Sequence, residues 1–253
     1  MPNKSSICVL VSGGLDSDVL VCELAKKYRS VYPVYIRQGL IWEKVELYWL
    51  RRFLSSFRRK PHVVTAVKTG AQSVDWIPAC AGMTALGVFC QGDRIMPLTI
   101  LSLPMTDLYG AHWSTGGGAV PDRRSRDAAV YLPGRNLALS VKAAVFCALN
   151  KIPALAIGSL DHNPFPDASP HFFKSWGGAL GEGLGRPLKI QAPYRRRSKA
   201  DVIRRGRQYP IELSFSCIAP QKKFHCGRCN KCAERKKAFR KAGVEDKTKY
   251  AQR

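Results

Sequence analysis

The sequence predicts an α/β protein with a doubly wound parallel sheet and a smaller C-terminal appendage. Three observations lead to this fold class. Strand-like apolar runs alternate with segments of helical periodicity through the first half of the chain, as they do in parallel α/β sheets. Two glycines directly follow the first apolar run and precede a helical segment. Four closely spaced cysteines lie in a polar, turn-rich segment near the C-terminus.

The expected elements follow one another in the order of such a sheet. The first strand is the apolar run at 7–11, and the apolar residues after Ser17 recur at helical spacing. The later elements are strands at 31–36, 98–103 and 153–158 and helices at 42–57 and 136–150. In sheets of this kind, ligands bind outside the carboxyl ends of the strands. This rule brings three distant segments together as neighbours: 12–17, 37–38 and 159–167.

Two stretches interrupt the alternation. The stretch from about 59 to 94 is long for a loop inside a compact domain. We interpret it as an insertion, and a short strand at 63–67 is the alternative. The loop at 111–132 combines glycines with basic residues, which suits either a mobile cover over a phosphate site or a loop without fixed structure. We divide the chain into an α/β domain at 1–205 and a cysteine-containing region at 206–253.

The chain carries a strong positive charge. Lys and Arg number 41 against 18 Asp and Glu, which gives a formal net charge of +23. Such a balance attracts polyanions, including nucleic acid and ATP. The basic residues form small separate clusters without interleaved aromatics, so we favour a solvated basic surface over a dedicated nucleic-acid site.

Composition also bears on location. No apolar run is long enough to span a bilayer, and the N-terminal segment does not read as a signal peptide. We therefore expect a cytoplasmic protein without a membrane partner, in which most cysteines are reduced or bound to metal.

The turn after the first strand predicts a phosphate-binding site. It reads Ser12-Gly13-Gly14-Leu15-Asp16-Ser17. A strand that passes through two glycines into a helix offers an anion both backbone N–H groups and the positive end of the helix dipole. The two serines supply hydroxyl contacts and a helix cap, and Asp16 supplies a candidate Mg²⁺ ligand. The spacing matches neither a Walker A loop nor a dinucleotide fingerprint.

The four cysteines near the C-terminus predict a closed metal site. Cys217, Cys226, Cys229 and Cys232 have the spacing C-x8-C-x2-C-x2-C. Four thiolates in a short polar segment match tetrahedral Zn²⁺, so we expect a helical, zinc-binding appendage. An iron–sulfur cluster is the alternative, because the cysteine spacings of the two kinds of site overlap. His225 is a candidate substitute for one thiolate, although four cysteines already complete the shell.

The S-G-G-x-D-S pattern at the end of the first strand resembles the PP-loop of the ATP pyrophosphatase superfamily. With the cysteine pattern, it makes the chain similar to the 7-cyano-7-deazaguanine synthases of the queuosine pathway. Further segments that resemble this family lie at 131–136 (Y-L-P-G-R-N), at 156–159, at Pro166-Asp167 and at 198–203 (S-K-A-D-V-I). The resemblance covers nearly the whole chain apart from the interpreted insertion, and it implies an adenine nucleotide alpha hydrolase-like fold.

The resemblance implies an ATP-dependent carbon–nitrogen ligase. The family turns 7-carboxy-7-deazaguanine and ammonia into 7-cyano-7-deazaguanine (preQ0) through an adenylated carboxylate, with ATP, Mg²⁺ and Zn²⁺ as its cofactors. The implied catalytic residues are Asp16, Arg135 and Lys199. The implied ATP-binding residues are Ser12, Gly13, Gly14, Leu15, Asp16 and Ser17, and the implied deazapurine-binding residues are Asp161 and Asp167. A homodimer is left open.

Two alternatives remain beside this reading, because the chain departs from the family pattern at 18–19, 35–39 and 163–168. One is a PP-loop paralogue that acts on another carboxylate or directly on tRNA. Direct tRNA binding is the less favoured possibility, and strong salt-sensitive binding would support it. The other alternative is a non-catalytic, zinc-stabilised basic binding protein, against which the intact turn argues.

Overall fold

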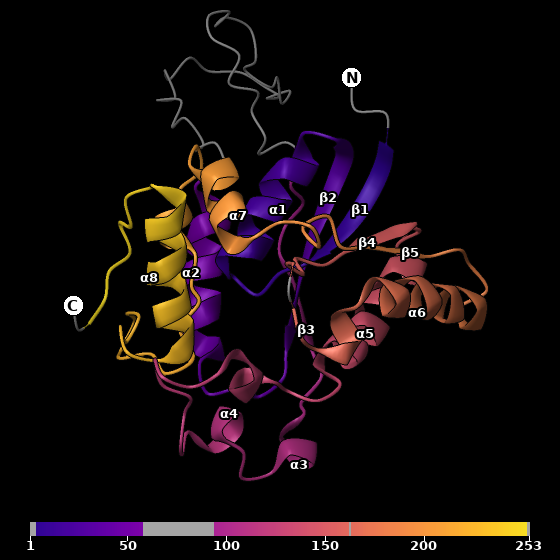
Figure 1. The fold of residues 1–253 in the computed structure, drawn as a ribbon. Helices are drawn as coiled ribbons and strands as arrows, with labels where there is room; N and C mark the ends of the chain where they lie inside the picture. Colours follow the sequence, from indigo (N-terminus) through magenta and orange to yellow (C-terminus); the bar gives the residue numbers. More distant parts are fainter. Residues whose placement is uncertain (1–3, 58–93, 162, 252–253) are drawn as a thin grey trace, which may run out of the picture.

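The computed structural model describes residues 4–57, 94–161 and 163–251 (Figure 1). They form a five-stranded parallel sheet with the strand order β3-β2-β1-β4-β5. The strands are β1 (Lys4–Leu10), β2 (Tyr28–Arg37), β3 (Thr99–Ser102), β4 (Ala154–Ala156) and β5 (Lys189–Gln191). Because the chain winds outward in both directions from β1 and β4, the carboxyl ends of these two strands border the crevice where such sheets bind ligands.

Helices cover both faces of the sheet (Figure 1). On one face lie α1 (Leu15–Ala25), α2 (Glu43–Ser55), α7 (Lys199–Gly206) and α8 (Asn230–Ala242). On the other face lie α5 (Arg135–Leu149) and α6 (Pro170–Gly183). The short elements between them are α3 (Thr106–Tyr109), α4 (Trp113–Gly116) and the 3₁₀ turns η2 (Asp127–Val130), η3 (Pro166–Ala168) and η4 (Ile211–Leu213).

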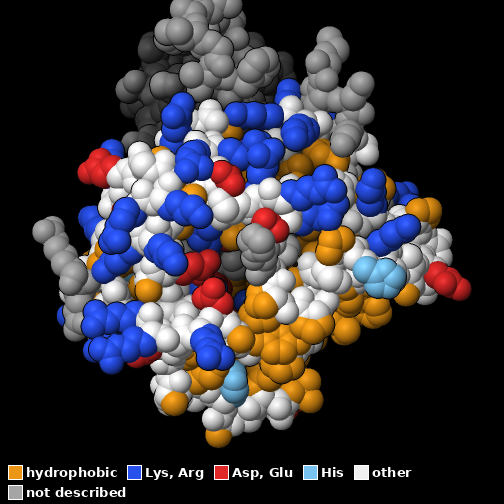
Figure 2. Space-filling view, viewed as in Figure 1, with side chains coloured by type: hydrophobic (Ala, Val, Ile, Leu, Met, Phe, Trp, Pro, Cys, Tyr) orange, Lys and Arg blue, Asp and Glu red, His pale blue; other side chains and the backbone are white. Residues whose placement is uncertain are grey.

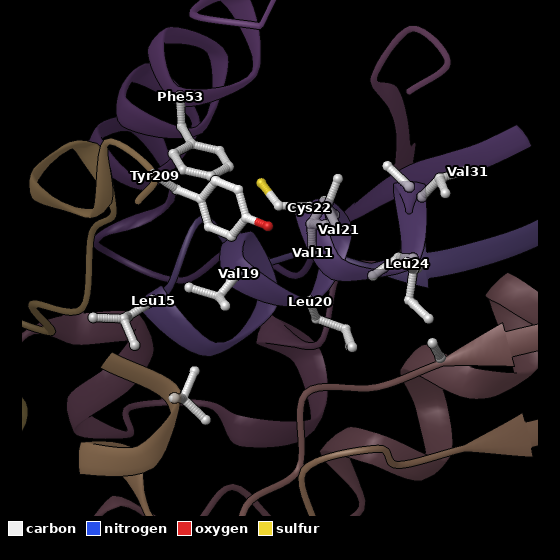
Figure 3. Close-up of a cluster of buried hydrophobic side chains, with 14 of the residues drawn as sticks. Val11, Leu15, Val19, Leu20, Val21, Cys22, Leu24, Val31, Phe53 and Tyr209 are labelled. Atoms are coloured by element: carbon white, nitrogen blue, oxygen red, sulfur yellow. The ribbon is translucent and has the colours of Figure 1, made fainter. Parts of the chain in front are cut away.

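The central strand explains the continuous apolar run in the sequence. Ile7 and Val9 of β1 point into the buried cluster on the α1 face, whereas Cys8 points into the cluster on the α5 face. Successive side chains of a strand alternate between its faces, so a strand covered on both sides is apolar at every position. Figure 3 shows the first cluster, in which Phe53 of α2 and Tyr209 lie beside the side chains of α1.

The C-terminal region shares buried clusters with the α/β unit. Phe239 of α8 belongs to the same cluster as α1 and α7. A third cluster joins Trp42, Leu132 and Phe215 to the four cysteines of the predicted metal site. The domain boundary at 205/206 stays a prediction. Residues on both sides of it belong to the same buried clusters.

Most expected elements match observed ones. The strands expected at 7–11, 31–36, 98–103 and 153–158 correspond to β1, β2, β3 and β4, and the helices expected at 42–57 and 136–150 correspond to α2 and α5. The fold class is thereby confirmed. Two further elements, α6 and β5, were not predicted from the sequence. The loop expected at 111–132 holds α4 and η2, and its role as a cover stays a prediction.

Two earlier interpretations concern residues that the structure does not describe. The interpreted insertion at about 59–94 and the alternative strand at 63–67 lie outside the described residues, apart from Arg94. In the described parts of the chain, none of the helices combines the length and the apolar character that crossing a bilayer requires.

Candidate active site and metal centre

The glycine turn connects β1 to α1 through a small network of hydroxyl hydrogen bonds. Ser12 Oγ accepts from Gly14 N at 3.2 Å, and Ser17 Oγ donates to Gly14 O at 2.9 Å. Ser17 Oγ also accepts from Ser12 N at 3.3 Å. No side chain caps α1 at Gly14, which leaves the first amides of the helix to an anion. The turn therefore has the strand–glycine–helix form that the sequence predicts, and its binding of phosphate stays a prediction.

Gly13 is the position where this turn tolerates no side chain. Its φ is +71°, in the left-handed region that favours glycine. A Cβ there would lie 3.1 Å from Glu46 O and 3.1 Å from Leu50 Cβ, both on α2. The close approach of α2 to the turn thus depends on glycine twice, once for backbone conformation and once for space.

Gly13→Ala is expected to destabilise the protein by about 1–3 kcal/mol, because it combines a strained φ with a tight contact. Urea unfolding measures this loss. Gly178→Ala is the control, since Gly178 lies within α6 and a Cβ there meets nothing within 4 Å. That change should be neutral or stabilising, because alanine favours a helix. Equal stability of the two variants would contradict the assignment of Gly13.

A pocket of about 210 Å³ opens beside the turn. Its wall comes from the ends of β1 and β2, the turn, α2, the start of α5 and the segment after β4. Its polar lining includes Ser12, Asp16, Tyr35, Glu46, Arg135 and Ser159. Arg135 Nε donates to Gln38 Oε1 at 2.8 Å, so segments 12–17, 37–38 and 159–163 meet at this edge of the sheet, as the ligand-edge rule predicts.

Lys199 lies next to the turn, between two carboxylates. Its Nζ is 3.6 Å from Asp16 Oδ2 and 2.7 Å from Glu234 Oε1. Burial lowers the pKa of Lys199, but Asp16 and Glu234 outweigh it and raise that pKa overall. The ammonium therefore stays charged. Lys199 is the first residue of α7, and Ser198 and Asp201 form a capping box that fixes the first turn of this helix.

Asp16 has a buried carboxylate oxygen beside the turn. Burial raises its pKa more than Lys199 lowers it. Its Oδ1 is buried and has no hydrogen-bond partner among the described residues. A buried carboxylate oxygen without a donor is unfavourable unless a ligand satisfies it, so the site fits a cation at Oδ1.

Glu46 was missed by the sequence analysis. It lies on the buried face of α2, lines the pocket, and accepts a hydrogen bond from Tyr35 Oη at 2.6 Å. Burial raises the pKa of Glu46 to about 7 against the opposing effect of Arg135. The missed signal was an acid on the apolar stripe of a helix, four residues before Leu50 and seven before Phe53.

Glu46→Gln is expected to gain stability over the parent as pH rises. Because the pKa is raised, ionised Glu46 costs folding free energy only above its ordinary pKa of 4.5. This cost grows with pH until the pH passes the raised pKa of about 7. The gain should reach about 3 kcal/mol near pH 8 and vanish near pH 4. Urea unfolding at both pH values measures it. Glu245→Gln, at an exposed side chain, should show no such trend, and a pH-independent gain in Glu46→Gln would contradict the assignment.

The three aspartates outside the turn that the sequence singled out differ in their surroundings. Asp167 is buried, and its Oδ2 accepts from Asn136 N at 2.9 Å, which fixes the start of α5 beside Arg135. Asp161 is exposed, and its backbone N donates to Arg197 O at 3.0 Å. Neither carboxylate lines the pocket, whereas Asn163 between them does. Asp18, one of the departures from the family pattern, is fully buried, and burial raises its pKa. Direct contact of Asp161 and Asp167 with substrate stays a prediction.

The four cysteines converge as expected. Their Sγ atoms all lie within 4.8 Å of one another. Cys217 and Cys229 are 3.8 Å apart at sulfur, and Cys226 and Cys232 are 3.9 Å apart. Those distances are the edges of a tetrahedron around one ion with metal–sulfur bonds of about 2.3 Å. The donor set therefore fits a single tetrahedral metal ion.

The backbone around the cysteines also suits a thiolate site. Gly227 has φ +81°, which lets the chain turn tightly after Cys226. The backbone N of Cys229 donates to Cys226 Sγ at 3.3 Å. His225 does not join the cluster, because its Nε2 accepts from Ser216 N at 3.1 Å. Among the described residues the four cysteines thus form the ligand set, and His225 does not substitute for one of them.

Arg235 joins the metal region to the rest of the chain. Its side chain is only 1% exposed, and its guanidinium donates to Thr248 Oγ1, Ser214 Oγ, Ser216 Oγ and Ile211 O at 2.8–3.1 Å. A buried guanidinium is tolerated when each donor finds an acceptor. The hydrogen bonds fix α8 against the segments before and after it.

The sheet order, the glycine turn at the end of its first strand and the four-thiolate cluster define a class of protein: a PP-loop α/β protein with an added cysteine site. A family model described as queuosine biosynthesis protein QueC matches residues 89–243. The chain belongs to this QueC family, and the resemblance seen in the sequence is confirmed.

Two relatives show how far the likeness extends. A 7-cyano-7-deazaguanine synthase of Methanobrevibacter smithii is 32% identical over 254 residues, which cover 99% of both chains. A 7-cyano-7-deazaguanine synthase of Anaeromyxobacter dehalogenans is 32% identical over 171 residues, which cover 63% of this chain and 73% of the relative. Among solved structures, the U34-tRNA thiolase NcsA from Methanococcus maripaludis is similar at a TM-score of 0.45 and 11% identity, over 98% of this chain and 76% of that one. This last likeness is too distant to say anything of function.

Proposed function

We propose that this protein is an ATP-dependent carbon–nitrogen ligase that makes 7-cyano-7-deazaguanine from 7-carboxy-7-deazaguanine and ammonia, for queuosine biosynthesis. The observation that carries the proposal is the full-length similarity to a protein named for that product, together with a pocket that joins the glycine turn to Asp16 and Arg135. The ligase class, the use of ATP and the nitrogen donor are parts of the proposal.

The proposed reaction activates a carboxylate and then replaces its oxygens by nitrogen. A carboxylate oxygen attacks the α-phosphorus of ATP, and pyrophosphate leaves. Ammonia then attacks the acyl carbon, loses a proton, and AMP leaves to give the amide. The amide oxygen then attacks the α-phosphorus of a second ATP, and pyrophosphate leaves. The nitrogen gives up two protons, and the oxygen leaves as part of AMP, which yields the nitrile. The protein must stabilise negative charge on phosphate oxygens at both activations.

The residues of the pocket suit these demands. The turn from Ser12 to Ser17 would hold the phosphates, and Lys199 beside it would offset charge on the leaving pyrophosphate. Asp16 would bind Mg²⁺ through the buried oxygen that lacks a partner, and Mg²⁺ supplies charge neutralisation when bound. Arg135 lies across the pocket, where its planar guanidinium suits a carboxylate or phosphate. Asp161 and Asp167 are proposed for the deazapurine.

Glu46 is a candidate proton acceptor for the amidation step. Glu46 lines the pocket, and burial raises the pKa of its carboxyl to about 7, close to the pH at which a general base works best. Ammonia must lose a proton after it attacks the acyl carbon, and a buried carboxylate in the same pocket can take that proton.

We propose that the cysteine site holds Zn²⁺ in a structural role. In an iron–sulfur cluster the four thiolates are shared among two or more irons, so their sulfurs do not all lie as close together as the 4.8 Å seen here. Four thiolates also leave no open position for catalysis on the metal.

The function is tested by incubating the protein with ATP, Mg²⁺, ammonium and 7-carboxy-7-deazaguanine and following the products by mass spectrometry. We expect the nitrile, the intermediate amide, and AMP. Absence of any acceptor-dependent nucleotide cleavage by folded, metal-loaded protein would overturn the proposal. Cleavage with another carboxylate, but not with this one, would favour the paralogue alternative.

A second candidate function, direct action on tRNA, draws support from the distribution of charge. Arg123, Arg124 and Arg126 are exposed on the loop that packs on the start of α8 through the bond from Asn230 Nδ2 to Ser125 O at 2.8 Å. The exposed segment 195–197 adds three arginines beside Asp161. Within the described ranges, none of these six guanidiniums makes an ion pair.

Figure 2 shows Lys and Arg side chains gathered over much of one face, and hydrophobic side chains gathered at its lower right. Titration of labelled tRNA at several salt concentrations distinguishes the candidates. An affinity for tRNA that falls steeply with salt, and that is lost when the arginines at 195–197 are changed to glutamine, would favour direct action on tRNA. Weak binding of tRNA that depends little on salt would favour the small-molecule proposal.

A homodimer remains part of the proposal. The outer face of α5 exposes four apolar side chains at four-residue spacing: Leu137, Val141, Val145 and Leu149. An unpartnered apolar stripe on a surface helix is typical of an interface. Sedimentation of the protein and of Val145→Lys tests it, and a monomer in both cases would remove the dimer. The cytoplasmic location stays a prediction.

A further inference from the structure

Glu234 was not among the residues that the sequence pointed to, yet it is the closest partner of Lys199. The distance from Lys199 Nζ is 2.7 Å to Glu234 Oε1 and 3.6 Å to Asp16 Oδ2. The ammonium is thus held mainly by an acid outside the glycine turn, and it reaches the turn only at the longer distance.

Glu234 is itself fixed from the metal side. It lies on α8, whose first turn contains Cys232 and whose N-cap position is Cys229. Its second oxygen, Oε2, accepts from Lys231 Nζ at 2.8 Å. Both oxygens of Glu234 are therefore used, each by one lysine.

The next turn of α8 contributes to the same rigidity. Arg235 makes four hydrogen bonds to segments on either side of the helix. The carboxylate of Glu234 therefore projects from a helix that is anchored at its start by the cysteines and along its length by a buried guanidinium. A side chain on such a support can set the position of a flexible lysine.

We propose that Glu234 is a positioning residue that holds Lys199 away from Asp16 and so links the cysteine site to the nucleotide pocket. Without this carboxylate, Asp16 is the remaining acid beside Lys199, and the ammonium closes onto the oxygens that nucleotide and cation would use. The inference rests on the proposed function in one respect, since it takes the turn to bind nucleotide.

A link of this kind acts in both directions. If the metal-anchored helix improves nucleotide binding through Glu234 and Lys199, bound nucleotide must improve retention of the metal by the same factor. This reciprocity gives a measurement that does not depend on turnover.

The first test compares Glu234→Gln with Glu245→Gln in the full-length, metal-loaded protein. Glu245 lies beyond α8, where its exposed carboxylate contacts Lys247 at 3.8 Å, so the control removes the same charge from the same region. Calorimetry with MgATP should show affinity about tenfold weaker for Glu234→Gln, the loss of one charge-assisted hydrogen bond, and unchanged affinity for the control. In turnover, KM for ATP should rise while kcat changes much less.

The second test follows the release of metal to a coloured chelator with and without MgATP. Nucleotide should slow release from the parent and from Glu245→Gln, and it should not slow release from Glu234→Gln. Should Glu234→Gln fail to retain metal after purification, Glu234→Asp keeps the charge but shortens the reach, and it should show weakened nucleotide binding.

The outcomes separate the two proposals. Nucleotide binding by the parent with unchanged affinity in Glu234→Gln overturns the role of Glu234 and leaves the proposed function standing. Absence of nucleotide binding by the parent, even with acceptor present, overturns the proposed function and the positioning role together.

Discussion

Asp16→Asn is expected to reduce turnover about a thousandfold while leaving the fold at least as stable as the parent. The carboxylate is the candidate anionic ligand for Mg²⁺ at the turn, and losing one preorganised charge at a phosphoryl-transfer site costs on this order. Stability should not fall, because burial raises the pKa of Asp16. The ionised side chain therefore costs folding free energy at neutral pH, and that cost disappears in acid.

Product formation by mass spectrometry and the melting temperature by calorimetry measure the two parts of this prediction. Asp107→Asn, on the exposed face of α3, is the control, and it should change neither quantity. Turnover within tenfold of the parent would contradict the role of Asp16. A large loss of stability would show that Asp16 acts through the fold instead.

Cys229→Ser is expected to lose the metal and to lower the melting temperature by about 10 °C. All four cysteines are buried, at 0–3% exposure, so removal of one thiolate leaves the others charged or protonated in an apolar cluster. Breaking a buried charged site costs about 3–5 kcal/mol, and each kcal/mol lowers the melting temperature of a chain of this size by about 2–4 °C.

Elemental analysis and calorimetry test this prediction, and hydrogen exchange should place the loosening in 206–253 and at α7. Cys147→Ala is the control for removing a buried thiol outside the cluster. It should keep the metal and lose less stability. A stable, metal-free Cys229→Ser protein would contradict a structural role for the site.

The elements that sequence predicted are those whose signal is local. β1 and β2 are covered on both faces, so their apolar runs are unbroken. The glycine turn and the cysteines are compact motifs in which spacing alone determines what converges. These parts could be predicted from the sequence without knowledge of the tertiary packing.

α6 could not be read in the same way, because its packing overrides its local preference. Several glycines lower the helical propensity of this segment. Two of them are required by close contacts: a Cβ at Gly177 would lie 3.3 Å from Ile190 Cγ1, and one at Gly181 would lie 3.1 Å from Arg186 O. The glycines that argue against a helix in sequence thus allow it to approach β5. The one usable signal was Ser169-Pro170, whose serine caps the helix.

The residues of the candidate site also differ in whether a local sequence signal points to them. Asp16 and Arg135 could be named from motifs, whereas the pairing of Lys199 with Glu234 joins residues far apart in the chain. Glu46 is intermediate, since only the mismatch between an acid and an apolar helical stripe points to it. Contacts of this kind become visible only once the topology is known.

The antiparallel run of α2 relative to the strands has a practical consequence. α2 starts beside the pocket and carries the chain to Phe57 at the opposite rim of the sheet. The chain rejoins the described structure at Arg94, whose carbonyl accepts from Val31 N at 2.8 Å near the beginning of β2. The connection between Phe57 and Arg94 therefore begins and ends at the rim of the sheet that is remote from the glycine turn. This connection is therefore the place to shorten the chain, or to graft a fluorescent reporter, without disturbing chemistry at the other rim.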